Sequence, residues 1–294
     1  TDDHDDGNCT AGDCTLREAI GAANGGAGLN TIVFDPALSG AIVLTLGELT
    51  ISDDLIIDGP GSAILAVDGN HASRVFTVQG GGGPRPNSAI TVAINGLAIT
   101  NGVANTSPGG GGLFIDQLAT FSGDDLNVSG NRAPAYDGGG IHNAGVATLT
   151  NSRVHDNSVG YPAADYTQYG GGIFDANGAQ LTLTNVEIDS NSIVDISYGS
   201  GRGAGLAIGY NGSATLQDVG IHHNQITVTG DGGGVYFSGN LSLTNSRVHD
   251  NSVVDGSGGG FYAYYPGGGL AIDRSAVYSN TAPVAGGGIA VTGQ

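Results

Sequence analysis

The chain of 294 residues contains no lysine, no methionine and no tryptophan, and its eight positive charges are all arginines. Twenty-seven acidic residues outweigh them, and the formal net charge is −19 at pH 7. This charge repels phosphate backbones and anionic bilayers, which argues against nucleic acid and membrane surfaces as partners. Apolar runs of about 18 residues, the length that a membrane span needs, are also missing, so no transmembrane segment is expected.

Cysteine is almost absent, with only Cys9 and Cys14. These two residues could close a small disulfide loop, and the lack of other thiols suits an oxidising compartment. A structural zinc site is disfavoured, because it requires four nitrogen or sulfur ligands and no further cysteine follows.

Glycine, in contrast, is abundant, with 55 residues. Collagen is excluded, because the glycines do not recur at every third position and there are only nine prolines. From about residue 95 onward a glycine-rich element repeats instead, and we expect it to form sharp corners. The copies are Gly109–Ile115, Gly138–Asn143, Gly170–Ala176, Gly203–Ile208, Gly232–Phe237, Gly267–Ile272 and Gly286–Val291.

Two further strand-like segments follow each middle copy, as in LTLTN and then VEIDSNS. Three short strands per repeat, stacked on copies of themselves, predict an all-β, single-stranded parallel β-helix. Valine or isoleucine and then asparagine recur at fixed places in the last segment, which predicts an inward aliphatic row and a hydrogen-bonded asparagine ladder. The closing asparagines are Asn131, Asn157, Asn191, Asn224, Asn251 and Asn280, spaced 26 to 34 residues apart.

The chain is expected to divide into an N-terminal cap, residues 1–30, and a β-helix, residues 31–294. In the cap, Thr15 and Glu18 have capping-box spacing at the start of an amphipathic helix over 15–24. Such a helix, pinned by a Cys9–Cys14 bridge, would cover the first coil. Irregular coils are expected to about residue 94, and regular GGG[ILV] and SxVxxN coils after it.

Residues 7–24, GNCTAGDCTLREAIGAAN, closely resemble the CSLREA-type N-terminal domain of bacterial secreted and surface β-helix proteins. The resemblance extends over 6–102 through NTIVFD, ISDDLIIDGPG and INGLAITNG, and the later repeats are similar to those of polymorphic outer-membrane proteins. It implies a right-handed β-helix, with export to an extracellular or cell-surface location. It implies no catalytic mechanism.

Polysaccharide lyases and galacturonases share the β-helix scaffold, so a polysaccharide-active enzyme is the alternative. Lyase chemistry commonly uses a lysine or arginine base beside charge neutralisation of a uronate. Lysine is absent and the protein would repel a uronate, so we expect no catalytic residues.

Two sets of residues could bind metal, although no cofactor is expected to be required. Repeat alignment superposes His155, Asp189, His222 and His249 at one outward position, which forms either a polar row or a divalent metal site. Near the N-terminus, Asp2, Asp6 and Asp13 fall at EF-hand-like offsets, which makes Ca²⁺ the ion to test there.

Tyrosines gather where the repeat length varies, in the segments 159–169, 193–202 and 253–265 between a closing asparagine and the next corner. Insertions in a solenoid collect on one edge, which is often the binding face, and tyrosine offers broad contact area. This edge is expected to contact polysaccharide or another surface protein. The candidates are Tyr136, Tyr161, Tyr166, Tyr169, Tyr198, Tyr262, Tyr264 and Tyr265.

The last repeat stops after GGGIAVTGQ, one strand into its coil. We therefore expect either a fragment of a longer surface protein or a subunit that stacks end to end into a filament. The function indicated is a secreted, non-catalytic structural or adhesive β-helix, with a polysaccharide-binding or polysaccharide-active protein as the alternative.

Overall fold

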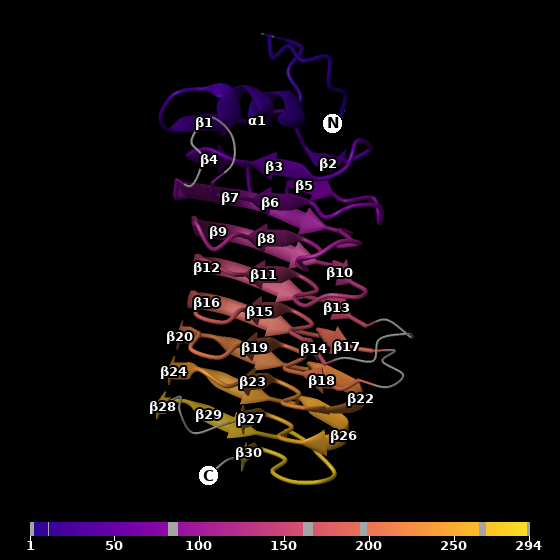
Figure 1. Cartoon of the computed structure of the whole chain (residues 1–294), viewed down its shortest axis with the longest axis vertical. Coiled ribbons are helices and arrows are strands. Elements are labelled where there is room, and N and C mark those ends of the chain that lie inside the picture. Colours follow the sequence, from indigo (N-terminus) through magenta and orange to yellow (C-terminus); the bar gives the residue numbers. More distant parts are fainter. Residues whose placement is uncertain are drawn as a thin grey trace.

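A computed structural model describes residues 3–10, 12–81, 88–160, 167–194, 199–264 and 269–292. One helix and 30 strands occur in these ranges, and the strands stack as successive rungs along one axis (Figure 1). All pairs between these strands are parallel, which confirms the all-β parallel solenoid.

The described strands form three sheets. The first sheet comprises β1 (Asn30–Val33), β2 (Gly40–Val43), β4 (Leu55–Asp58), β5 (Leu65–Asp68), β7 (Ile90–Thr100), β9 (Ala119–Ser129), β12 (Val146–His155), β16 (Gln180–Asp189), β20 (Ser213–Gln217), β21 (Gly220–His222), β24 (Asn240–Thr244), β25 (Arg247–His249), β28 (Leu270–Asp273) and β29 (Ala276–Tyr278). The second comprises β10 (Arg132–Ala133), β13 (Ser158–Val159), β14 (Gln168–Tyr169), β17 (Ser192–Ile193), β18 (Gly201–Arg202), β22 (Gln225–Asp231) and β26 (Ser252–Ser257). The third comprises β3 (Leu49–Ile51), β6 (Phe76–Val78), β8 (Leu113–Ile115), β11 (Ile141–Asn143), β15 (Ile173–Asp175), β19 (Leu206–Ile208), β23 (Val235–Phe237), β27 (Phe261–Tyr264) and β30 (Ile289–Thr292).

Helix α1 (Leu16–Gly25) lies at the N-terminal end of this column (Figure 1). The capping box is confirmed, because Thr15 Oγ1 accepts from the Glu18 backbone N–H and Glu18 Oε2 accepts from that of Thr15. The Cys9–Cys14 disulfide is also present. Arg17 pairs with Asp3 and donates to the carbonyl of Glu48, which ties the helix to the first coils.

The glycine corners are confirmed by their backbone. Gly170, the first of its triplet, has φ +65°, a left-handed conformation that favours glycine. A Cβ on the third glycine, Gly172, would lie 2.8 Å from Asn191 Nδ2 and 2.7 Å from the Gly205 carbonyl. The glycine corner therefore lies against the asparagine ladder. A side chain at Gly172 would push apart the two adjacent coils.

The aliphatic row and the asparagine ladder are both present. The row Val128, Val154, Ile188, Ile221, Val248 and Val277 follows the strand register. In the ladder, Asn157 donates from Nδ2 to Asn191 Oδ1, and Asn191 donates from Nδ2 to Asn224 Oδ1, each at 3.0 Å. These three amides are fully buried, so they hydrogen-bond the coils together inside the core.

The glycine-rich segment Gly267–Ile272 was wrongly assigned to a corner. Leu270 pairs with Leu241, so the described part of this segment, residues 269–272, enters β28 of the first sheet. The corner of that coil is Gly258–Gly260, where Gly258 has φ +69° and β27 pairs with β23. Both triplets precede apolar residues, so their letters alone cannot distinguish them.

Three sheets are present, which gives each coil three faces as predicted, but the third face does not lie where the sequence places it. In β12 and β16 the second and third predicted strands run together and bend at Asn151 and Asn185, which both have positive φ. The third face is instead the second sheet, formed by residues after each ladder asparagine. The segments taken as insertions therefore contribute strands such as β14 and β18 to the wall of the solenoid.

Candidate functional site

Four of the eight candidate tyrosines fall within the described ranges, while Tyr161, Tyr166, Tyr198 and Tyr265 lie outside them. Tyr136 follows β10 in a loop and packs against the apolar residues beneath the second sheet. The other three lie on strands, Tyr169 on β14 and Tyr262 and Tyr264 on β27. Their positions are therefore fixed by the sheets and not by loops.

An outward row of rings runs along the third sheet. The strand register gives one position per coil, with rings at Phe114, His142, Phe174, Tyr236 and Tyr262 and with Ala207 between Phe174 and Tyr236. Rings in adjacent coils are 5.0 to 5.8 Å apart, at the spacing of stacked or edge-to-face pairs. Ala207 interrupts the row with a side chain too small to fill the place of a ring.

Arg202 of β18 brings a positive charge beside this interruption. Its guanidinium carbon lies 5.6, 5.0 and 5.3 Å from the ring centroids of Tyr169, Tyr236 and Tyr264, within cation–π range. Its Nη1 donates to the hydroxyls of Tyr169 and Tyr236 at 2.9 and 3.1 Å. The arginine thus fixes rings that come from three different coils.

These residues border a cavity of about 770 Å³, which we call the aromatic groove. Its rings are Tyr169, Phe174, Tyr210, Tyr236 and Tyr264, and its polar side chains are Asp137, Asn177, Arg202 and Ser238. Tyr210 and Tyr264 are 62% and 39% exposed, whereas Tyr236 is nearly buried. Flat rings, a few polar groups and this volume are typical of small-molecule and sugar sites.

The predicted binding residues did not include Phe174, Tyr210 or Tyr236. A usable signal was present for two of them, since an aromatic residue follows the aliphatic one in GGGIF and GGGVY. That position faces outward on the third sheet, directly beside the corner.

Asp137 contributes a carboxyl group to the groove. Burial raises its pKa to about 7, although the Tyr169 backbone N–H, 2.8 Å from Oδ1, lowers it. Nearby on the same face, burial lowers the pKa of His142 to about 4, so this imidazole is neutral at pH 7. Near neutral pH, therefore, Asp137 gains or loses a proton while His142 stays neutral.

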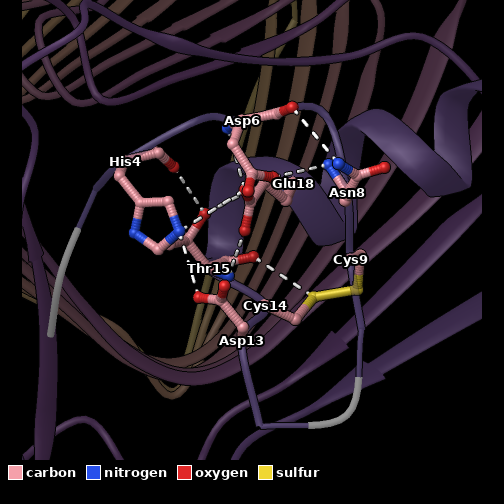
Figure 2. The surroundings of a disulfide bond; sticks show 8 residues. All are labelled: His4, Asp6, Asn8, Cys9, Asp13, Cys14, Thr15 and Glu18. Atoms are coloured by element: carbon pink, nitrogen blue, oxygen red, sulfur yellow. Dashed lines mark hydrogen bonds and ion pairs between the residues drawn. A yellow bond between two sulfur atoms is a disulfide. The ribbon is translucent and has the colours of Figure 1, made fainter.

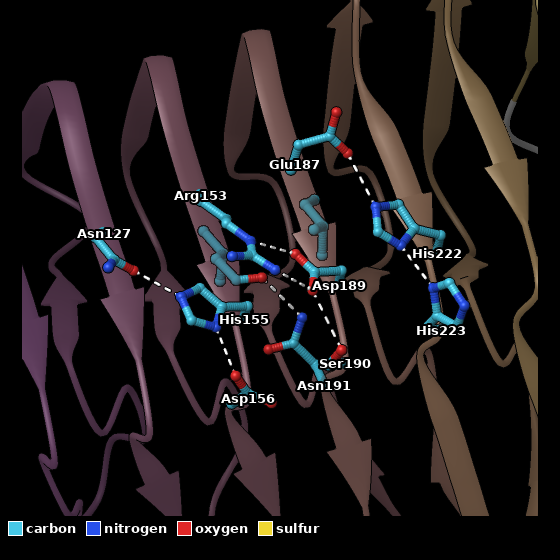
Figure 3. A network of polar contacts seen from close by, with 12 residues as sticks. Asn127, Arg153, His155, Asp156, Glu187, Asp189, Ser190, Asn191, His222 and His223 are labelled. Atoms are coloured by element: carbon cyan, nitrogen blue, oxygen red, sulfur yellow. Dashed lines mark hydrogen bonds and ion pairs between the residues drawn. The ribbon is translucent and has the colours of Figure 1, made fainter.

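The predicted polar row lies on the first sheet, where His155, Asp189, His222 and His249 are register partners. Figure 3 shows the first three of these side chains. Arg153 binds both carboxylate oxygens of Asp189 at 2.7 Å. Burial opposes ionisation of Asp189, but Arg153 outweighs it and the pKa is lowered. His155 is also engaged, with Nε2 on Asn127 and Nδ1 on Asp156.

Protein groups also hold the predicted calcium loop (Figure 2). Asp6 Oδ1 accepts from the Asn8 N–H, and His4 Nε2 lies 3.2 Å from Asp13 Oδ1. Asp2 lies outside the described residues. Within the described parts of the chain, no three His, Cys, Asp or Glu side chains converge on one point. Ca²⁺ in this loop and metal at the polar row remain predictions.

The solenoid part of the chain is similar to a known protein family. A family model described as the right handed beta helix region matches residues 88–293. Neither the curated proteins nor the solved structures contain a match. The likeness of the N-terminal part to CSLREA-type domains therefore remains a prediction, as does that of the repeats to polymorphic outer-membrane proteins. Among the described residues there is also no helix with the length and hydropathy to cross a bilayer.

The matched segment covers well over half of the chain, and the strands within it stack as parallel rungs. The protein belongs to the right-handed β-helix family.

Proposed function

We propose that this chain is an extracellular, non-catalytic β-helix protein with an adhesive role, and that it binds a neutral polysaccharide in the aromatic groove. The observation that carries the proposal is the set of five rings around one cavity, with Arg202 fixed among them. Sugar rings present flat C–H faces that stack on aromatic side chains, and polar side chains at the rim hydrogen-bond their hydroxyls.

Charge supports a neutral ligand over an acidic one. The net charge of −19 repels polyanions at long range. The charge of Arg202 is already shared by three tyrosine faces and two tyrosine hydroxyls. The disulfide in the cap suits an oxidising, extracellular location.

Loss of the exposed rings tests the groove. We expect Tyr210→Ala and Tyr264→Ala each to weaken binding of a neutral polysaccharide about tenfold, the equivalent of roughly 1.4 kcal/mol of lost stacking. The measurement is isothermal titration calorimetry against a panel of neutral and acidic polysaccharides. Tyr278→Ala is the matched control, because Tyr278 is 45% exposed but lies on the first sheet, outside the groove. Equal losses in all three variants, or no neutral ligand in the panel, would contradict the proposal.

The enzymatic alternative depends on Asp137, whose pKa of about 7 would suit a general acid or base. Incubation with the same panel distinguishes the two functions. Binding without depolymerisation, by the protein and by Asp137→Asn alike, is expected for an adhesin. Depolymerisation that Asp137→Asn abolishes would establish the enzyme instead.

Adhesion by a β-helix is compatible with assembly of its subunits. The proposed partner is then a second copy, stacked end to end or side by side. Negative-stain electron microscopy checks this, with fibres of regular axial repeat expected and monodisperse short rods as the contrary outcome.

A further inference from the structure

One coil carries two histidines side by side, His222 at the end of β21 and His223 directly after it (Figure 3). Successive residues of a strand point to opposite faces, but His223 has φ +55°, and this left-handed turn directs its ring toward that of His222. The two Nδ1 atoms lie 2.8 Å apart. The following coil places a histidine and an aspartate at these positions, His249 and Asp250.

Glu187 determines the tautomer of His222. Its Oε2 lies 3.1 Å from His222 Nε2, so this nitrogen carries the proton and donates to the carboxylate. The Nδ1 lone pair of His222 then points at His223, whose Nδ1–H donates to it. A carboxylate on the far nitrogen is the usual support of a metal-binding histidine.

Gly220 makes room for this carboxylate. It is the register partner of Glu187, and a Cβ on it would lie 1.9 Å from Glu187 Oε2. A cavity of about 350 Å³ lies beside these residues and reaches both His222 and His249. The glycine thus allows Glu187 to reach His222 from the adjacent coil.

Stacking fixes the plane of the His222 ring. The His249 ring lies 5.0 Å from it at 12°, and the Tyr278 ring continues the stack 4.8 Å from His249 at 5°. The His222 side chain is nevertheless 23% exposed. A small ion can therefore reach a pair of nitrogens whose positions the sheet maintains.

We propose that His222 and His223 chelate Cu²⁺ through their two Nδ1 atoms. Adjacent nitrogens around a tetragonal ion, with bonds of about 2.0 Å at right angles, are roughly 2.8 Å apart. This is the observed separation, whereas a tetrahedral ion needs roughly 3.3 Å. On binding, His223 changes to the tautomer with its proton on Nε2, so no proton is released and both Nδ1 lone pairs are available to an ion that lies beside the line joining them. Water completes the coordination of Cu²⁺. The net negative charge of the protein attracts the cation.

Titration of the full chain with Cu²⁺, followed by calorimetry and electron paramagnetic resonance, tests the site. We expect one ion whose spectrum shows coupling to two imidazole nitrogens, and weaker binding of Zn²⁺. His223→Asp should weaken this binding about tenfold or more, since a supporting group alone is worth about that much. This variant recreates the corner of His249 and Asp250, so it should retain the fold.

A second variant and a control complete the experiment. His222→Asp, which places there the residue that β16 has in the same row, should also remove the two-nitrogen spectrum. His155→Ala should leave it unchanged, because both His155 nitrogens already have partners. An unchanged spectrum in both aspartate variants, equal loss in His155→Ala, or tighter Zn²⁺ than Cu²⁺ binding would overturn the proposal.

Discussion

Asn191→Ala is expected to lower the free energy of unfolding by about 4 kcal/mol or more. The Asn191 amide donates to the Val154 carbonyl and to Asn224 Oδ1, and its Oδ1 accepts from the backbone and side-chain nitrogens of Asn157. All of these side chains are buried, so alanine leaves several polar groups without partners, at about 1–3 kcal/mol each. Urea unfolding followed by circular dichroism gives the value.

An exposed asparagine provides the matched control. Asn185 lies in the same coil as Asn191, at the bend of β16, where its Nδ2 donates to Asn151 Oδ1 at the surface. Because Asn185 has φ +53°, glycine retains its backbone conformation, and Asn185→Gly should cost less than about 1 kcal/mol. A similar cost for both variants would show that burial of the ladder contributes little.

Asp175→Asn is expected to stabilise the protein progressively, relative to the unmodified chain, as the pH rises from 4 to 8. Asp175 points into the core from β15, and its Oδ1 accepts from Asn143 Nδ2 at 2.7 Å. Its Oδ2 has no hydrogen-bond partner within the described structure. Burial raises the pKa of this carboxyl from 3.8 to about 7, against the opposing bond from Asn143.

Proton linkage gives the direction in which the free energy of unfolding changes with pH. Between pH 3.8 and 7 the unfolded chain loses the Asp175 proton while the folded chain retains it, so stability falls as pH rises through this window. Above pH 7 both states are ionised and the loss is constant, at up to about 4 kcal/mol. The uncharged amide removes this dependence, and melting curves at pH 4 and 8 measure the difference.

Asp189→Asn is the control of opposite sign. Asp189 lies on β16 of the first sheet, and Arg153 lowers its pKa despite burial. The stabilisation that ionised Asp189 gives the folded state is present at neutral pH and is lost as the pH falls through its lowered pKa. Asp189→Asn should therefore be less stable than the unmodified chain at pH 7. Parallel pH profiles for the two variants would contradict the assignment of Asp175.

The repeat could be predicted from the sequence because each coil makes the same contacts with its neighbours. Glycine before an aliphatic residue indicates a corner, and an asparagine that closes SxVxxN indicates the ladder, as at Gly170 and Asn191. The capping box of Thr15 and Glu18 was equally local. These features depend on a few adjacent residues and on periodicity.

The aromatic groove was only partly predictable, because it depends on which residues stack across coils. Arg202 reaches Tyr169 and Tyr236 because the register places their strands in neighbouring coils, and the lengths of the intervening segments hide this relation. The glycine triplet before Leu270 was misassigned for the same reason. The pairing of Leu270 with Leu241 determines which sheet follows the triplet, and this pairing is not visible in the letters. The approach of His222 and His223 depends on the left-handed conformation of His223, which Asp156, Ser190 and Asp250 also adopt at the same place in other coils.

The asparagine ladder also gives the solenoid a direction. The hydrogen bonds between ladder side chains all run the same way: each Nδ2 donates to the Oδ1 of the following coil, as from Asn157 to Asn191 and from Asn191 to Asn224. The amide dipoles therefore align along the axis and polarise one another, as in a chain of peptide groups. Two copies meeting head to head would set donor against donor or acceptor against acceptor. Any array that continues the ladder from one molecule to the next must be polar, with all of its subunits pointing the same way.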